Sequence, residues 1–259
     1  MMMTENYVTK RMAESNLEGL ANNSYPGRGI VVGLDKTGEY LVLIYWIMGR
    51  SANSRNRVFV KGRDDSISTQ PADPSQVKDP SLIIYTAVRE VGYAGRTVHV
   101  VSNGKQTDEI ADAYRTGRNL YDTLNRYEYE PDTPHFTSRI TACSGWRLPK
   151  ASPVTIMSIL RKSPWSNVCD HHQYEFNGIG RGFGHCITTY AGDGDPLPAF
   201  HGEPYLLPLC GDASSVASTF WRVLNSENRV SLVVKFVPKH GGPSQIVINN
   251  EYSKTPLTV

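Results

Sequence analysis

The order of strand-like and helix-like stretches is the feature that most constrains the fold of this chain. Helical spacing of apolar residues occurs in Thr107–Tyr127 and in Ala213–Leu224. The other patterned stretches are short and have the composition of strands: Ile30–Leu34, Glu39–Met48, Leu82–Val88, Thr97–Ser102, Phe136–Cys143, Val154–Arg161, His185–Tyr190, Val230–Val237 and Ile246–Asn249. Groups of strands separated by single helices predict an α+β layered fold with antiparallel sheets rather than a doubly wound parallel sheet.

The domain organisation follows from the stretches that lack this pattern. No repeat, low-complexity tract or linker divides the 259 residues, so we expect one domain over residues 25–259. Residues 1–24 are polar and weakly patterned, which predicts an N-terminal extension or short helix that frays near Met1. Residues 62–80, rich in Asp and Pro, predict a solvated connection. The Gly- and Pro-rich residues 177–208 predict a long insertion between strands.

Charge and cysteine content exclude several classes of protein. The 27 Lys and Arg residues against 25 Asp and Glu give a formal charge of +2, so no overall field attracts nucleic acid or anionic lipid. The first twenty residues contain no apolar stretch of signal-peptide length, and the longest apolar run, Tyr40 to Met48, is half a membrane span. Four cysteines without a CxxC pair predict reduced, mostly buried thiols. These observations predict a cytoplasmic protein.

Polar segments at the ends of the expected strands indicate a pocket for a small phosphorylated molecule. The turn at residues 102–104 joins a strand to a helix, and two segments upstream carry arginines, at 25–28 and 50–57. A hairpin of the first two strands brings its open ends together, so Arg28 and Arg50 should lie close in space. Their planar, permanently charged guanidinium groups suit a phosphate.

The start of the first helix contributes to the same expected pocket. Thr107 or Asp108 is the expected N-cap, and the backbone N–H groups of the first turn add donors toward an anion. The Asp108 carboxylate would repel phosphate, so it suits a helix cap or the ribose hydroxyls instead.

Six motifs follow one another along the chain. They are Tyr-x-Gly-Arg at 25–28, Arg-Ser…Asn-Arg at 50–57, Tyr85-x-x-x-Arg89, Val-Val-Ser-Asn-Gly-x-x-Thr-Asp at 100–108, Tyr129-Glu130, and Thr133-Pro134…Arg139-Ile140. In this order they resemble the inosine-monophosphate (IMP) cyclohydrolases of the archaeal type and their bacterial relatives. The resemblance implies a four-layer αββα sandwich similar to N-terminal-nucleophile hydrolases. It also implies closure of 5-formamidoimidazole-4-carboxamide ribonucleotide to IMP with loss of water in purine biosynthesis, without metal or cofactor.

The resemblance implies that Arg57, Tyr85 and Glu130 are catalytic, and Asn103 matches through its motif. Ring closure needs positioning, stabilisation of an oxyanion and a proton shuttle. We expect Arg57 or Asn103 near the formyl oxygen, Glu130 in proton transfer, and Tyr85 holding the carboxamide or sharing in proton transfer. The residues expected around the nucleotide are Arg28, Arg50, Ser51, Ser102, Thr107, Asp108 and Arg139.

Two alternatives remain open beside a cyclohydrolase. One is a noncatalytic purine-nucleotide-binding protein, and the other is an amide hydrolase of the same fold; the presence of Tyr85 and Glu130 favours the cyclohydrolase. No metal site is expected, because the soft ligands lack zinc-finger spacing: Cys169, His171, His172, His185 and Cys186. Family members are usually oligomeric, so the resemblance implies a homo-oligomer.

Overall fold

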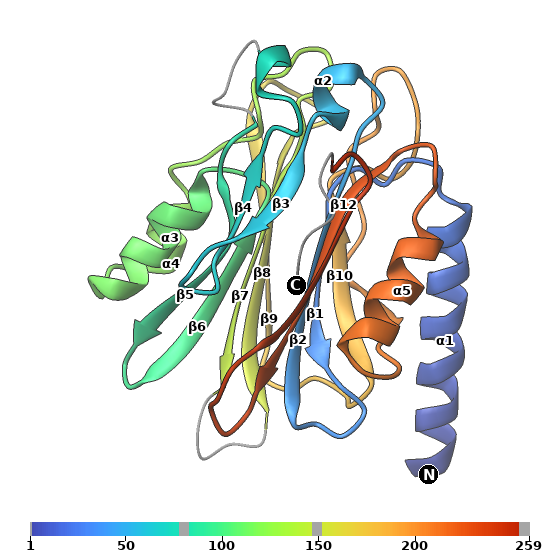
Figure 1. Cartoon of the computed structure of the whole chain (residues 1–259), viewed down its shortest axis with the longest axis vertical. Helices are drawn as coiled ribbons and strands as arrows, with labels where there is room; N and C mark the ends of the chain where they lie inside the picture. Colours follow the sequence, from blue (N-terminus) through green and yellow to red (C-terminus); the bar gives the residue numbers. More distant parts are fainter. Residues whose placement is uncertain (1, 78–82, 147–151, 254–259) are drawn as a thin grey trace.

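Two antiparallel sheets face each other in the computed structural model, which describes residues 2–77, 83–146 and 152–253 (Figure 1). The six-stranded sheet has the order β11-β10-β1-β2-β12-β13. Its strands are β1 (Gly29–Leu34), β2 (Tyr40–Met48), β10 (Phe183–Thr188), β11 (Tyr205–Pro208), β12 (Arg229–Pro238) and β13 (Gln245–Asn250). The seven-stranded sheet runs in sequence order from β3 to β9. Its strands are β3 (Val58–Lys61), β4 (Ile67–Gln70), β5 (Thr86–Tyr93), β6 (Arg96–Ser102), β7 (Arg139–Trp146), β8 (Pro153–Lys162) and β9 (Cys169–Phe176).

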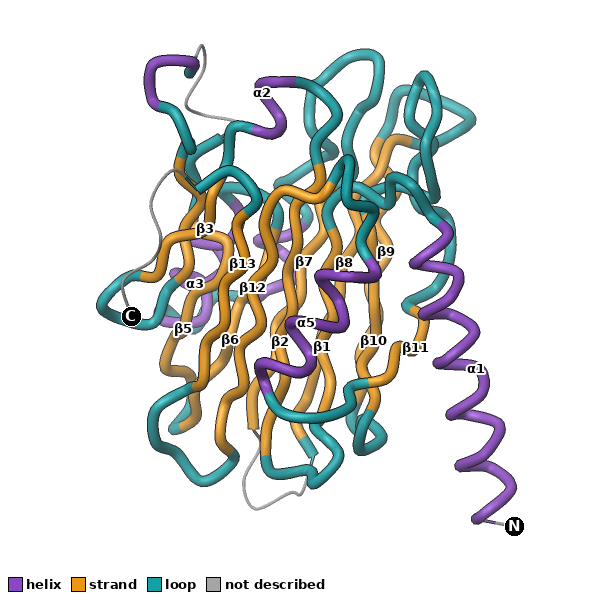
Figure 2. Tube along the Cα trace, turned by 45° about the vertical axis from the view of Figure 1, so that its right-hand side comes forward, coloured by secondary structure: helices purple, strands orange, loops and turns teal. Residues whose placement is uncertain are grey.

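Helices cover the outer face of each sheet. Helices α1 (Met2–Asn22) and α5 (Ala213–Val223) lie against the six-stranded sheet, and Figure 2 shows α1 beside β11. Helices α3 (Gln106–Arg115) and α4 (Leu120–Leu124) lie against the seven-stranded sheet. The short α2 (Ala52–Arg55) and η1 (Pro74–Gln76) lie in loops. The expected α+β class with antiparallel sheets is therefore confirmed, and its layers follow the order helix, sheet, sheet, helix.

Strand β1 shows why the two sheets stack. Ile30, Val32 and Leu34 contribute to the core between the sheets, whereas Val31 packs toward the helices on the outer face. Its neighbour β2 is buried along almost its whole length, because it is central in its sheet and covered on both faces. These two strands form the expected hairpin, with Gly29 opposite Trp46.

Four strands were not expected from the sequence. Residues 62–80 are not a plain connection, because β4 and η1 lie within them, and β3 precedes them. Strand β9 is mostly polar and exposes alternate side chains from His171 to Glu175, and β11 lies in the Gly- and Pro-rich region together with β10. The expected strand Leu82–Val88 instead begins at Thr86 and continues to Tyr93, and Leu82 falls outside the described residues. The strand expected from Phe136 begins at Arg139.

The helices also differ from the expectation. The prediction of a single helix over Thr107–Tyr127 is wrong, because the chain forms two helices, α3 and α4. They are separated at Gly117, whose φ of 68° is left-handed. Neither Thr107 nor Asp108 is the N-cap, which is Lys105. Most of residues 1–24 form α1. Within the described residues, none of the helices combines the length with the apolar composition that a membrane span requires.

The four cysteines are free, as expected, but only two of them are fully buried. Cys143 and Cys186 lie inside the fold, Cys169 is half-buried and Cys210 is exposed. Burial raises the pKa of the Cys143 and Cys186 thiols to about 12. Both buried cysteines therefore remain neutral thiols.

Candidate active site

Four segments meet at one end of the sandwich and enclose a cavity of about 280 Å³. They are residues 25–28 before β1, 48–57 after β2, 130–137 before β7, and 190–197 after β10. Because β1 and β2 are antiparallel, the start of one and the end of the other lie at the same edge. The structure thus brings Arg28 and Arg50 to one cavity, as the hairpin predicts.

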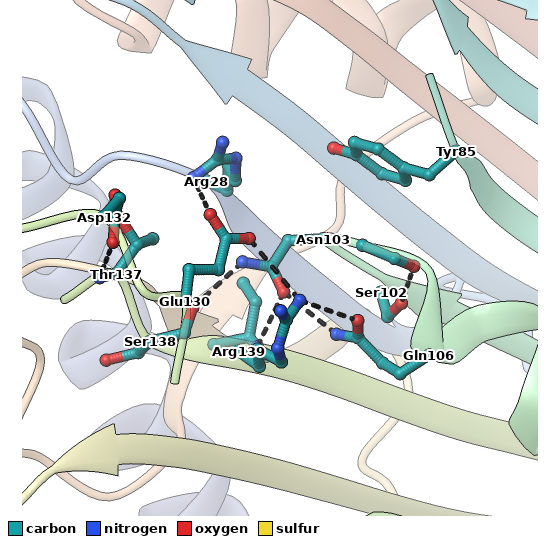
Figure 3. A network of polar contacts seen from close by, with 12 residues as sticks. Arg28, Tyr85, Ser102, Asn103, Gln106, Glu130, Asp132, Thr137, Ser138 and Arg139 are labelled. Atoms are coloured by element: carbon teal, nitrogen blue, oxygen red, sulfur yellow. Dashed lines mark hydrogen bonds and ion pairs between the residues drawn. The ribbon is translucent and has the colours of Figure 1, made fainter. Parts of the chain in front are cut away.

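Arginines surround a single buried carboxylate in this cavity (Figure 3). Nη1 of Arg28 lies 3.9 Å from Oε2 of Glu130, and Nη1 of Arg139 lies 3.7 Å from Oε1. Glu130 is 7% exposed. Both distances exceed a hydrogen bond, and no described residue donates one to this carboxylate, so its lone pairs stay available to a ligand.

The two innermost guanidinium groups respond differently to burial. Burial opposes the charge of Arg28, but the neighbouring Glu130 carboxylate outweighs it and raises the pKa of Arg28 well above its usual value. Burial and the nearby Arg28 lower the pKa of Arg57. Nε of Arg57 has no hydrogen-bond partner among the described residues. A buried cation with an unused donor is the arrangement that binds an anion.

Arg50 and Ser51 lie at the more open side of the cavity. The Arg50 side chain is 33% exposed, forms an ion pair with Asp193, and lies over the Tyr25 ring at 5.0 Å. Ser51 caps α2 by accepting a hydrogen bond from the backbone of Ser54. Cationic and hydroxyl groups therefore border the entrance.

Tyr85 reaches the interior of the sandwich from just before β5. Its hydroxyl lies 2.7 Å from that of Tyr45 on β2, in a hydrogen bond between the two sheets. Burial raises the pKa of Tyr45 well above its usual value, and Tyr85 adds to the shift. Tyr45 is therefore a neutral phenol.

Asn103 is buried and holds the end of β6 against β7. Its amide oxygen accepts hydrogen bonds from the backbone N–H of Ile140 at 2.9 Å and from Nε2 of Gln106 at 3.2 Å. Its amide nitrogen donates to the Ser138 carbonyl at 2.9 Å. One amide hydrogen is left over among the contacts of the described residues.

Neither Asn103 nor any other residue of the 102–108 turn lines the cavity. Ser102 and Thr107 hydrogen bond to each other at 2.5 Å, and both contact the Gly104 carbonyl. Asp108 pairs with Arg89 at 2.5 Å on the outside of the sheet. These contacts hold the turn that carries Asn103, whereas the cavity itself is formed by other segments.

Several lining residues were not singled out from the sequence. They are Tyr25, Asp132, His135, Thr137 and Tyr190. Tyr25 is the first residue of the Tyr-x-Gly-Arg motif, and Asp132, His135 and Thr137 lie between Glu130 and Arg139. Their positions within or between the family motifs were the signal that could have identified them. Phe136, with a left-handed φ of 47°, turns the backbone between His135 and Thr137.

The candidate metal ligands do not converge on a site. No group of three or more His, Cys, Asp and Glu side chains that could hold a metal ion occurs within residues 2–77, 83–146 and 152–253. His185 instead stacks on Phe176, with ring centroids 3.8 Å apart.

Comparisons with known proteins show the family of this chain. The family model of IMP cyclohydrolase-like proteins matches residues 25–241. The IMP cyclohydrolase of Methanococcus maripaludis (strain C5) is 32% identical over 124 residues, which is 45% of this chain and 58% of that protein. That of Methanocella arvoryzae is 32% identical over 122 residues, 46% of this chain and 56% of that protein, so the chain spans little more than half the length of these relatives. The match over residues 25–241 shows that the chain belongs to the IMP cyclohydrolase-like family.

Proposed function

We propose that the protein is an IMP cyclohydrolase, which closes 5-formamidoimidazole-4-carboxamide ribonucleotide to IMP with loss of water. The observation that carries this proposal is the buried Glu130 carboxylate between guanidinium groups in a cavity of about 280 Å³. This volume lies near the lower limit of about 300–1,000 Å³ for ligand pockets, which suits a compact ligand. The names of the archaeal relatives support the reaction.

The depth of the cationic groups suggests how the nucleotide lies. Arg50 and Ser51 at the entrance suit the 5′-phosphate, together with the hydroxyl of Ser54. Arg28 is held beside Glu130, so it serves the reacting end in this arrangement rather than the phosphate. The base then enters toward Glu130, Arg57 and Tyr85.

The chemistry needs an oxyanion donor and an acid–base group. Arg57 is the better oxyanion donor, because it lines the cavity with an unused Nε, whereas Asn103 lies outside the cavity lining and holds β6 against β7. Glu130 takes a proton from the attacking carboxamide nitrogen, and Tyr85 orients the carboxamide. Ser102 and Thr107 stabilise the turn that carries Asn103. The further likeness to N-terminal-nucleophile hydrolases remains a prediction about the fold and supplies no step of this mechanism.

The test follows IMP formation from the purified protein and the formamido ribonucleotide in EDTA-containing buffer. We expect turnover by the wild type, and a loss of at least about 100-fold in kcat for Glu130→Gln, in line with removal of a general acid–base group. Arg57→Ala should cost about 2.7–4 kcal/mol of transition-state stabilisation. Both variants should still bind IMP, as measured by isothermal titration calorimetry.

Two matched controls lie on the surface near α4. Glu128→Gln and Arg126→Ala remove the same charges from exposed positions and should leave kcat unchanged. IMP binding without turnover in the wild type would indicate a noncatalytic nucleotide-binding protein. Release of an amine or carboxylate from a different amide, without IMP formation, would indicate a hydrolase of the same fold.

A further inference from the structure

A chain of hydrogen bonds runs along one wall of the cavity, from Tyr190 through Thr137 to Asp132. The hydroxyls of Tyr190 and Thr137 are 2.5 Å apart, and the Thr137 hydroxyl donates to Oδ2 of Asp132. The Thr137 backbone N–H donates to Oδ1 of the same carboxylate at 2.6 Å. All three residues line the cavity.

The direction of this chain is fixed by hydrogen counting. The Thr137 hydroxyl has one hydrogen, which Oδ2 of Asp132 receives, so the oxygen of Thr137 can only accept from Tyr190. Burial raises the pKa of Tyr190 to about 12, which keeps its phenol protonated and able to donate. No other described group contacts the Tyr190 oxygen by a hydrogen bond, so its lone pairs are free to accept from a ligand.

Contacts of the Tyr190 backbone and ring hold this residue in place beside the cavity. The Tyr190 N–H donates to the Pro26 carbonyl at 3.2 Å, and the Tyr190 ring stacks on Tyr25 with centroids 6.0 Å apart. A Cβ on Gly27 would lie 2.5 Å from the Tyr190 ring, so only glycine permits this approach. The chain of hydrogen bonds therefore presents the Tyr190 hydroxyl to the ligand as a positioned acceptor.

Closure of the purine ring needs two proton transfers. The new C–N bond forms and the formyl oxygen leaves as water, so that oxygen gains two protons, one from the carboxamide nitrogen and one from the formamido nitrogen. Glu130 is one acid–base group, and it lies beside Arg28. Tyr190 lines the same cavity as Arg28 and Glu130. A second route for a proton is thus available in the same cavity.

We propose that Tyr190, Thr137 and Asp132 form a proton relay for this second transfer, an inference that rests on the proposed function. Tyr190 Oη accepts a proton from a substrate nitrogen while its own proton passes to Thr137 Oγ1, and the Thr137 proton passes to Asp132. Each hydroxyl oxygen gains one O–H bond and loses one, and the carboxylate is neutralised. The reverse transfers return the proton to the departing hydroxyl.

Hydroxyl removal and rescue at Thr137 test the relay. Thr137→Val should lower kcat by about 10²-fold or more, the range for loss of general acid–base catalysis, with KM and IMP affinity nearly unchanged. Thr137→Ser should retain kcat, because it restores the hydroxyl. Tyr190→Phe and Asp132→Asn should resemble Thr137→Val.

The matched control is Thr188→Val. Thr188 is buried, and its hydroxyl donates to the Tyr190 carbonyl at 2.9 Å. Thr188 belongs neither to the chain of hydrogen bonds nor to the cavity lining. This variant should retain kcat. Unchanged kcat in Thr137→Val, or an equal loss in Thr137→Val and Thr137→Ser, would overturn the relay while wild-type turnover upholds the proposed function. Absence of wild-type turnover would overturn the proposed function, and the relay with it.

Discussion

Single residues in the cavity take their roles from burial. Arg57 and Glu130 belong to residue types that are usually solvated, but they are 5% and 7% exposed. Between the two sheets, the buried hydroxyls of Tyr45 and Tyr85 hydrogen bond to each other. At such positions the loss of one polar atom leaves its partner buried without a hydrogen bond, which costs more than the bond itself contributes.

Tyr45→Phe tests the cost of an unpaired buried hydroxyl at the pair Tyr45 and Tyr85. The variant leaves the Tyr85 hydroxyl without its partner at 2.7 Å, so we expect the free energy of unfolding to fall by about 1–3 kcal/mol. Urea denaturation measures it. Tyr40→Phe, at a half-buried position at the start of β2, is the control and should change stability little. Equal stability of Tyr45→Phe and the wild type would show that Tyr85 finds another partner.

Secondary-structure elements differ in how clearly the sequence encodes them. Strands β1, β2 and β12 are nearly continuous apolar runs, and they lie next to one another at the centre of their sheet. Strands β3 and β4 are short and half polar, so their residues resemble a loop. Strand β9 buries alternate side chains only partly. A residue distant in the sequence stabilises β3, because the Asn250 side chain exchanges two hydrogen bonds with the Phe59 backbone, and local pattern does not contain that information.

The same distinction applies to the candidate site. Arg28, Arg50, Arg57 and Glu130 could be predicted to meet, because strand ends and quoted motifs place them at one edge. The 102–108 turn was expected to line the pocket, but a sequence does not show which side of a turn faces a cavity. Tyr190 lies far along the chain from the other lining residues, and only the pairing of β10 with β1 brings it to them.

Gly29→Ala tests the packing of β1. A Cβ at this position would lie 2.0 Å from Cζ2 of Trp46, its cross-strand neighbour, so the strand or the indole must move. We expect a loss of about 1–3 kcal/mol in the free energy of unfolding, typical of overpacking, measured by urea denaturation. Gly92→Ala on β5 is the control, since a Cβ there meets nothing within 4 Å. A stable Gly29→Ala would show that Trp46 can be displaced.

At the scale of the molecule, one polar cluster joins the two sheets at a distance from the cavity. Nζ of Lys235 on β12 lies 2.5 Å from Oε1 of Glu90 on β5, and Nδ1 of His99 on β6 lies 3.5 Å from the same oxygen. Lys235 and His99 are 1% and 2% exposed. Both sheets must be docked for these groups to meet.

His99 makes this docking sensitive to acid. Burial lowers the pKa of His99 to about 3, and Lys235 adds to the shift, whereas an unfolded histidine titrates near 6.5. The unfolded chain therefore binds a proton over the range from about 6.5 to 3 that the folded chain does not. The contribution to stability is fully present above pH 6.5 and decreases as the pH falls toward 3.

His99→Gln should remove this part of the pH dependence, at most about 1.4 kcal/mol per pH unit. The measurement is the free energy of unfolding in urea between pH 4 and 7, compared with the wild type. His240→Gln, at a side chain that is 73% exposed, is the control and should keep the wild-type slope. The same slope in His99→Gln would contradict burial of a neutral imidazole.

The pairing of β2 has a consequence for synthesis of the chain. β2 lies between β1 and β12, and Trp46 is opposite Leu232, so one edge of an almost wholly apolar strand has no partner until β12 has been translated. Until then the nascent hairpin presents free backbone hydrogen-bonding groups, which can pair with another chain. The strand that ends at the cavity is thus also a strand whose unpaired edge is exposed to other chains during synthesis.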